Sequence, residues 1–277
     1  MHSQAGTVPA DTQLGIPAMH YRRVGTGPAM VLLHGFPDNG SVWNDIAATL
    51  AADYTLYIPD LPGAGSSPLT QPASLAQMAV AVRHMLIAGG VARAVVVGHS
   101  MGGYVALAFA RLYPQVVAGL SMVHSTPAAD DDEKKAARTK VIDLILKGGK
   151  ATFIRQMTAN LFAPQFRAAH PDVVAAKEKL GMQLTDDGLI NFYRAMIGRD
   201  DNTAVVTDAP FPLQWIAGAE DAIVNYMKTL NLCHYSNVNF VTLYSECGHI
   251  SMIENPAKLV ADLSNFGHYC FYNHRGA

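Results

Sequence analysis

Cysteine and charge are both scarce in this sequence, and each shortage excludes a class of protein. Three of the 277 residues are cysteines (Cys233, Cys247 and Cys270), and no two of them form a Cys-x-x-Cys pair. This pattern argues against a disulfide framework and against a cysteine-bound zinc site. Charged residues make up 15% of the chain, the formal net charge is −2, and no basic stripe suggests binding to nucleic acid.

Long apolar runs are also missing. No uninterrupted run approaches the roughly 20 residues of a transmembrane helix. Residues Met1–Asp11 lack the basic start and the apolar segment of a secretion signal. We therefore expect a globular cytoplasmic protein, a monomer or a homodimer, with no membrane partner and no nucleic-acid partner. Hydrophobic residues form 50% of the chain, which at this length suffices for one large domain with an insertion.

Strand-like and helix-like segments alternate through most of the chain. Continuous apolar runs such as Ala29–Leu33 are typical of strands that are buried on both faces of a parallel sheet. The predicted strands are Met19–Val24, Ala29–Leu33, Thr55–Ile58, Val95–Val97, Val117–Val123, Leu213–Ala217 and Asn239–Tyr244. The predicted helices between them are Ser41–Ala52, Ser74–Ala88, Tyr104–Arg111, Asn225–Leu232 and Pro256–Phe266. The alternation predicts an α/β fold, with a mostly parallel central sheet and helices on both faces.

The alternation stops at Thr126-Pro127 and resumes after Asp208. The residues between them predict only helices, one beginning near Lys134 and others around Ala151–Leu161, Pro171–Leu180 and Gly188–Ile197. We therefore predict a core domain of residues 1–125 and 209–277, interrupted by a helical cap insertion at 126–208. The acidic run from Asp130 to Glu133 suits the solvent-exposed start of a helix, where negative charge is favourable.

The motif with the clearest chemistry is Gly98-His99-Ser100-Met101-Gly102, which lies between an apolar β-branched run and a helix-like run. A Gly-x-Ser-x-Gly sequence in this setting is typical of a sharp strand-to-helix turn that projects a nucleophilic serine. The flanking glycines provide room, because side chains there would collide with neighbouring backbone. Ser100 is therefore the predicted nucleophile.

A serine hydroxyl needs a base to take its proton and a third group to orient that base. Asp221 and His249 each follow a predicted strand, at the sheet edge where the Ser100 turn also opens. Glu220, next to Asp221, and Asp130, beyond the Val117–Val123 strand, are alternative acids. The chain order of serine, aspartate and histidine is that of the α/β-hydrolase triad.

The chain resembles an α/β-hydrolase of the small esterase-like group with a helical cap. The resemblance rests on His34-Gly35-Phe36-Pro37, on the loop Asp60–Ser67, on the Ser100 motif, on Gly218-Ala219-Glu220-Asp221 and on Gly248-His249. It implies that Ser100 is the nucleophile, His249 the base and then the acid, and Asp221 the residue that orients His249. It also implies an oxyanion hole formed by the backbone N–H groups of Phe36 and Met101. His34, Asp60 and Ser66 are expected to shape their loops.

We therefore expect a serine hydrolase that cleaves a small or medium, largely apolar carboxylic ester through an acyl-enzyme. The candidate substrate-binding residues in the cap are Met157, Phe162, Phe192 and Met196, although packing within the cap also accounts for them. A carbon–carbon hydrolase, an aminopeptidase-like amidase and a ligand receptor that retains the pocket are alternatives. For the first two, Arg155, Arg167, Arg194 and Arg199 are candidate anchors. No histidine pair has metal-ligand spacing with a carboxylate, so neither a metal nor a cofactor is expected.

Overall fold

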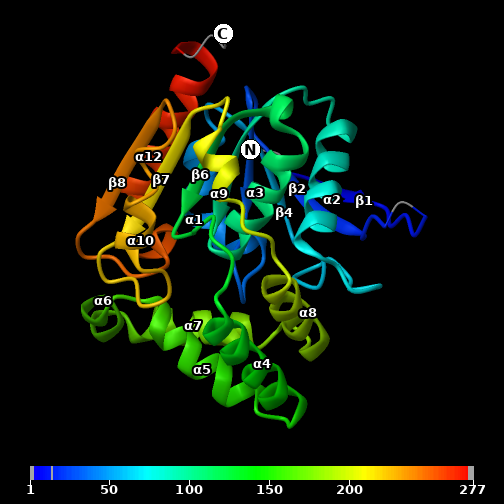
Figure 1. Cartoon of the computed structure of the whole chain (residues 1–277), viewed down its shortest axis with the longest axis vertical. Helices are drawn as coiled ribbons and strands as arrows, with labels where there is room; N and C mark the ends of the chain where they lie inside the picture. Colours follow the sequence, from blue (N-terminus) through cyan, green and yellow to red (C-terminus); the bar gives the residue numbers. More distant parts are fainter. Residues whose placement is uncertain (1–2, 14, 274–277) are drawn as a thin grey trace.

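The computed structural model describes residues 3–13 and 15–273, and its centre is one eight-stranded sheet (Figure 1). The order across the sheet is β1-β2-β4-β3-β5-β6-β7-β8. β1 and β2 pair antiparallel with their neighbours, and all the other pairs are parallel. The predicted α/β class with a mostly parallel sheet is therefore confirmed. The strands are β1 Gln4–Val8, β2 Met19–Val24, β3 Ala29–Leu33, β4 Thr55–Pro59, β5 Ala94–His99, β6 Val117–Val123, β7 Leu213–Gly218 and β8 Asn239–Tyr244.

Helices cover both faces of the sheet, and the alternation of side chains along each central strand divides the core in two. In β3, Val31 and Leu33 pack with the apolar side chains of α2 and α3, whereas Met30 and Leu32 pack with those of α1 and α12. This two-residue period is the geometry of a strand that is buried on both faces. The helices concerned are α1 Asn44–Leu50, α2 Leu75–Ala88, α3 Met101–Leu112 and α12 Pro256–His268, and shorter helices α10 Tyr226–Leu230 and α11 Ser251–Glu254 follow β7 and β8.

Two local details differ from the predictions for this part of the chain. The helix predicted from Ser41 begins instead as a 3₁₀ turn at Gly40–Trp43, because the Asn39 side chain accepts the Ser41 N–H and ends the preceding loop. Strand β1 is not among the predicted strands, because most of its residues are polar or small; pairing with β2 forms it, and Val8 at its end packs into the core. Ser74 caps α2 in a reciprocal capping box with Gln77, as its position before an apolar helix indicates.

Between β6 and β7 the chain is helical. Its elements are α4 Asp132–Leu146, α5 Lys150–Leu161, α6 Pro164–Ala169, α7 Pro171–Gly181, α8 Asp186–Ile197 and α9 Thr203–Thr207. Helices α4 to α8 gather beyond one end of the sheet, whereas α9 returns to pack against α3 (Figure 1). We use the name "helical insertion" for residues 126–208. None of the described helices is both long and apolar enough to cross a bilayer.

The helical insertion is fastened to the loops at the carboxyl ends of the strands. Lys177 of α7 forms a buried ion pair with Asp38, which lies just beyond the Phe36 loop. Burial lowers the pKa of Lys177 to about 7. Asn191 of α8 bonds to both backbone groups of Ala73. These contacts place the insertion directly over the edge where the site residues lie.

The acidic run at the start of α4 is only partly as predicted. Asp131 is exposed and accepts the Lys134 N–H as a helix cap. Asp130, however, is 4% exposed and pairs with Arg138 at 2.6 Å and Arg199 at 2.9 Å. Burial alone would raise the pKa of Asp130, but the two arginines lower it. The prediction of a solvated side chain was wrong for Asp130, because its cationic partners come from later in the chain.

Candidate active site

Ser100 occupies a strained turn between β5 and α3. Its φ of 52° and ψ of −116° lie outside the regions that ordinary residues adopt. The turn is held by the Ser100 N–H, which donates to the Val123 carbonyl at 2.9 Å, and by the Ser125 hydroxyl, which donates to the Ser100 carbonyl at 2.8 Å. Strain of this kind persists only where the surroundings enforce it, and it is concentrated at functional sites.

The flanking glycines meet the steric demand predicted for them. A Cβ on Gly98 would lie 2.5 Å from the Gly102 carbonyl oxygen, and one on Gly102 would lie 2.3 Å from the Leu33 carbonyl oxygen. Both distances are far too short for non-bonded contact, so no side chain fits at either position. Gly98 is therefore required by the tightness of the turn itself, and Gly102 by its close approach to the end of β3.

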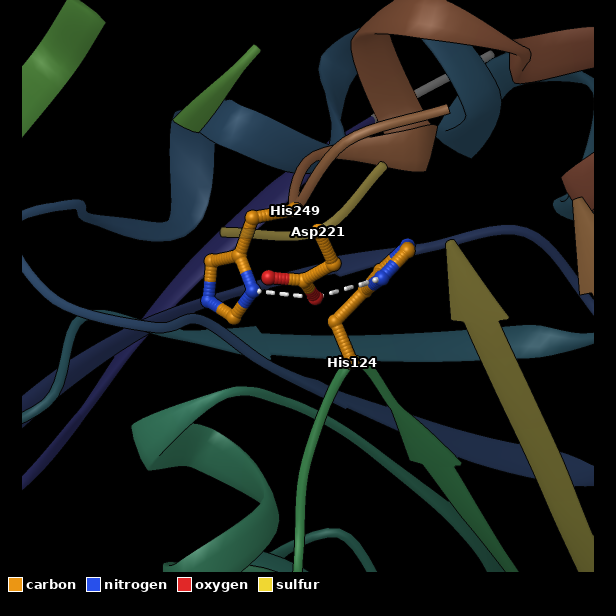
Figure 2. Close-up of side chains that lie close together, drawn as sticks. All are labelled: His124, Asp221 and His249. Atoms are coloured by element: carbon orange, nitrogen blue, oxygen red, sulfur yellow. Dashed lines mark hydrogen bonds and ion pairs between the residues drawn. The ribbon is translucent and has the colours of Figure 1, made fainter. Parts of the chain in front are cut away.

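Asp221 and His249 lie together at the same edge of the sheet. The Nδ1 atom of His249 is 2.8 Å from Oδ2 of Asp221, and both side chains are 1% exposed (Figure 2). The other ring nitrogen of His249 points away from Asp221 (Figure 2). Oδ1 of Asp221 accepts the backbone N–H groups of Ile223 and Val224, each at 2.8 Å. The carboxylate is thus fixed on one oxygen by its own loop and faces the imidazole with the other.

The two alternative acids lie elsewhere. Glu220 accepts a hydrogen bond from the Gln165 side chain in the helical insertion. Asp130 is held by Arg138 and Arg199. Of the three candidates, Asp221 is the one whose carboxylate bonds to His249.

Two further histidines surround this pair. The ring of His99, next to Ser100, lies 5.1 Å from that of His249, and its Nε2–H donates to the His249 carbonyl at 2.8 Å. His124 follows β6 directly, and its Nδ1 lies 3.3 Å from Oδ2 of Asp221 (Figure 2). His124 is not among the predicted site residues, although its position directly after a predicted strand is the same signal that located Asp221 and His249.

The electrostatics of this cluster favour one negative charge and neutral rings at 99 and 124. Burial by itself would raise the pKa of Asp221, but the facing His249 and the hydrogen bonds from both histidines lower it well below the usual carboxyl range. Burial lowers the pKa of His99 and of His124. Asp221 is therefore ionised at neutral pH, with two uncharged imidazoles beside it.

The side chains of His124, Asp221 and His249 lie close enough together to bind a metal ion. The ligand atoms of His124, Asp221 and His249 lie within 4.8 Å of one another. Spacing along the sequence concealed this cluster, because the three residues come from three separate strand ends. Both Nδ1 atoms already face the same carboxylate oxygen (Figure 2), so a metal here would displace the contacts that orient His249. The absence of a metal stays a prediction.

The Phe36 loop lies against the Ser100 turn. A Cβ on Gly35 would approach the Ser100 Cβ to 3.0 Å, so the two segments are in contact. Met101 begins α3, and the first N–H groups of a helix have no partner within it. His34 accepts the Leu61 N–H through Nε2 and bonds to the Gly35 carbonyl through Nδ1. Burial lowers the pKa of His34 to about 4, which agrees with the expected structural role of a neutral ring.

The loop after β4 is shaped by the Asp60 side chain as predicted, but not by the side chain of Ser66. Asp60 accepts the Gly40 N–H through one carboxylate oxygen and the Ser66 N–H through the other, both at 2.8 Å. Ser66 takes part through its backbone, while the neighbouring Ser67 hydroxyl bonds to the Asp60 carbonyl.

The candidate substrate-binding residues occupy different parts of the helical insertion. Phe192 is fully buried, and its ring meets that of Phe36 edge to face at 6.3 Å. Met157 is partly buried and packs against the core clusters on both faces of the sheet, so it lies over the sheet edge. Phe162 is buried and stacks on Phe166. Met196 is buried, and its sulfur faces Arg138 at 3.2 Å.

The helical insertion also holds the main chain around His249. The His249 N–H donates to the Leu161 carbonyl at 2.7 Å. A Cβ on Gly248 would lie 2.6 Å from the backbone nitrogen of Ala163, so these two backbone segments are in contact. Glu254 accepts both the Ala163 N–H, at 2.9 Å, and the Gly248 N–H, at 3.0 Å. The position of His249 therefore depends on residues 161–163 as well as on its own loop.

Comparisons with known proteins agree with this architecture. An esterase from Thermogutta terrifontis, solved with malate bound, superposes with a TM-score of 0.91 at 24% identity and covers 96% of this chain and 99% of its own. A pimeloyl-[acyl-carrier protein] methyl ester esterase of Xanthomonas campestris is 31% identical over 218 residues, which is 74% of this chain and 81% of that protein.

Other relatives match over a shorter stretch. An uncharacterised protein of Mycobacterium tuberculosis is 39% identical over 112 residues, so that the match spans 33% of its length. The sequence pattern of the alpha/beta hydrolase family matches residues 30–263, which is most of the chain and includes both core segments and the helical insertion. The chain therefore belongs to the alpha/beta hydrolase family.

Proposed function

We propose that this protein is a serine hydrolase that cleaves a small or medium, largely apolar carboxylic ester through an acyl-enzyme. The observation that carries the proposal is Ser100 on its strained turn, at the sheet edge where Asp221 bonds to His249. Both named relatives with long matches are esterases. The helical insertion acts as a cap over these residues, because its backbone contacts His249 and its aromatic rings contact Phe36.

Acyl transfer then proceeds in two halves. The Ser100 Oγ attacks the ester carbonyl carbon while His249 accepts the hydroxyl proton through Nε2. The resulting oxyanion is stabilised by the N–H groups of Phe36 and Met101. The C–O bond to the alcohol breaks, and the alcohol leaves with the proton from His249. Water then attacks the acyl-enzyme with His249 again as base, which releases the acid and restores Ser100. Asp221 holds the ring with Nδ1–H toward itself and stabilises the imidazolium.

The rings around Phe36 support an apolar acyl site. Phe153, Phe192 and Tyr193 of the insertion lie with their ring centroids 6.1, 6.3 and 4.8 Å from that of Phe36. Such a surface favours hydrocarbon over charge, by roughly 0.8 kcal/mol for each buried methylene.

The arginines of the insertion give little support to an anionic or amine substrate. Arg199 is buried on Asp130, and Arg155 pairs with Glu178. Arg167 donates to the Ala159 carbonyl. Arg194 is exposed beside Arg111 and Arg199, around a cavity of about 270 Å³ whose lining excludes Ser100 and His249. The carbon–carbon hydrolase and amidase alternatives therefore lack the anchors that motivated them.

A panel of substrates tests the proposed reaction. We expect the purified protein to turn over p-nitrophenyl esters many times per molecule, with a maximum at a short or medium acyl chain. A p-nitroanilide of the same acid and a vinylogous 1,5-diketone should react at least tenfold more slowly. Initial rates and the product yield per enzyme are the measurements. A faster reaction with the diketone or the anilide would replace the esterase assignment, and a single turnover with a lasting adduct would favour the receptor.

Met157 provides a test of the acyl site. We expect Met157→Ala to raise kcat/KM for a longer acyl ester relative to the acetyl ester by about fivefold, because removing a side chain over the sheet edge opens space for two or so methylenes. Met182→Ala is the matched control, since Met182 lies in the same insertion but is 37% exposed. An unchanged ratio in Met157→Ala, with the protein folded, would assign Met157 to packing.

A further inference from the structure

We infer that His124 is a positioning residue. It donates a second hydrogen bond to Asp221 and so weakens the interaction between the Asp221 carboxylate and the Nδ1–H group of His249. The inference rests on the proposed function and deepens it. His124 lies 3.3 Å from Oδ2 of Asp221, the same oxygen that His249 approaches to 2.8 Å (Figure 2). Its side chain has no exposed area, so water does not compete for this contact.

The tautomer of His124 follows from its partners. A neutral imidazole has one N–H and one lone pair. If Nδ1 carried the lone pair, it would face the lone pairs of an ionised carboxylate, and the proton on the buried Nε2 would have no acceptor among the described residues. If the proton is on Nδ1, the contact to Asp221 is a charge-assisted hydrogen bond, and the buried Nε2 is left with an unpaired lone pair rather than an unpaired N–H group. His124 is therefore a donor.

The backbone at His124 is arranged to present this donor. Its φ is +49°, in the left-handed region that only a small minority of residues other than glycine adopt. Its N–H donates to the Ile216 carbonyl at 2.8 Å, which continues the pairing between β6 and β7 by one residue. The chain thus accepts a strained residue at the end of β6, at the point where the imidazole reaches Asp221.

Among the described residues, no side chain other than His124 and His249 forms a hydrogen bond with Oδ2 of Asp221. The titratable side chains that interact with Asp221 from the surrounding elements are His99, His124 and Cys247, and Glu254 accepts the N–H of Gly248, next to His249. His99 donates to a backbone carbonyl rather than to Asp221. Burial raises the pKa of the Cys247 thiol to a value at which it stays neutral. Oδ2 of Asp221 therefore has two side-chain donors, and losing His124 would concentrate its charge on His249.

The consequence concerns the pH range of the reaction. His249 must be unprotonated to accept the proton of Ser100, and a stronger interaction with Asp221 favours its protonated form. Removing the His124 donor should therefore shift the acid limb of kcat/KM to higher pH. One hydrogen bond changes such an equilibrium roughly fivefold, so we expect a shift of about 0.5–1 pH unit.

Two substitutions separate the donor from the backbone. His124→Gly removes the donor and relaxes the left-handed residue, whereas His124→Asn tolerates the same φ and supplies an N–H₂ group close to the position of Nδ1. We expect His124→Gly to show the shift and His124→Asn to stay within about 0.2 unit of wild type. Equal shifts in both variants, or none in His124→Gly, would overturn the inference.

A measurement without turnover keeps this test separate from the proposed function. In a Ser100→Ala background with ¹³C-labelled histidine, the NMR titration midpoint of the His249 ring should move upward in His124→Gly as the acid limb does. This midpoint is measurable even if the protein is not an esterase. If His124→Gly does not fold, two-bond ¹H–¹⁵N spectra of the unsubstituted protein decide: a His124 ring protonated on Nε2 alone would overturn the inference.

Discussion

Ser100→Ala is expected to lower kcat/KM on the preferred p-nitrophenyl ester by about 10⁴-fold or more while the protein stays folded. In the proposed mechanism the Ser100 Oγ forms the acyl bond, and losing one member of a triad removes most of the rate enhancement. Alanine keeps the Cβ that Ser100 already has, so the strained turn gains no new clash. Steady-state rates and circular dichroism on the same preparation measure both parts of this prediction.

Labelling with a fluorophosphonate identifies the reacting serine directly. The unsubstituted protein should gain the mass of one phosphonyl group, and Ser100→Ala should gain none. Ser264→Ala is a suitable control, because Ser264 lies on α12, away from the carboxyl-end loops, and it should retain both labelling and activity. Near-normal rates from Ser100→Ala, with unchanged labelling, would assign the nucleophile to another residue.

Asp221→Asn is expected to lower kcat by about 10²- to 10⁴-fold. Asparagine keeps the shape of the side chain but loses the charge that, in the proposed mechanism, holds the proton on Nδ1 of His249 and stabilises the imidazolium. The effect on KM should be small, since Asp221 is buried and lies behind His249 rather than beside the substrate. Rates across a range of substrate concentrations separate the two constants.

The neighbouring residue offers a matched control. Glu220→Gln changes the adjacent carboxylate in the same way, but Glu220 bonds to Gln165, so its kcat should stay within about tenfold of wild type, or roughly 1.4 kcal/mol in activation free energy. A crippled Glu220→Gln with an active Asp221→Asn would mean that the turn presents the other acid in solution. A large loss of activity in Asp130→Asn would not by itself make Asp130 the acid that orients His249, because this substitution also leaves two arginines beside an uncharged partner.

The sequence predicted the architecture well because buried parallel strands and sharp turns leave strong local signals. The apolar run Ala29–Leu33 and the Ser100 motif need no long-range information to be recognised. Strand β1 and helix α6 carry no comparable pattern: the first is formed by pairing with β2, and the second has no buried residue.

The site was harder to predict where a residue's state depends on partners that are distant in sequence. The burial of Asp130 requires Arg138 and Arg199, and the role inferred for His124 requires Asp221, 97 residues later. The left-handed backbone at His124 also leaves only a weak sequence signal, because most histidines, though enriched there, do not adopt a positive φ. A position at the end of a strand reduces the number of candidate site residues, and the tertiary structure is needed to identify which of them interact.

The backbone contacts between residues 161–163 and His249 have a consequence for exchanging parts between relatives. The Leu161 carbonyl and the Ala163 N–H act through the main chain, so His249 depends on where the backbone of this stretch lies. Transplanting a foreign cap segment that shifts this short stretch by an ångström would displace the base, however well the new segment folds. A chimera with altered substrate preference should therefore keep residues 161–163 and Glu254 from one parent and vary the helices on either side.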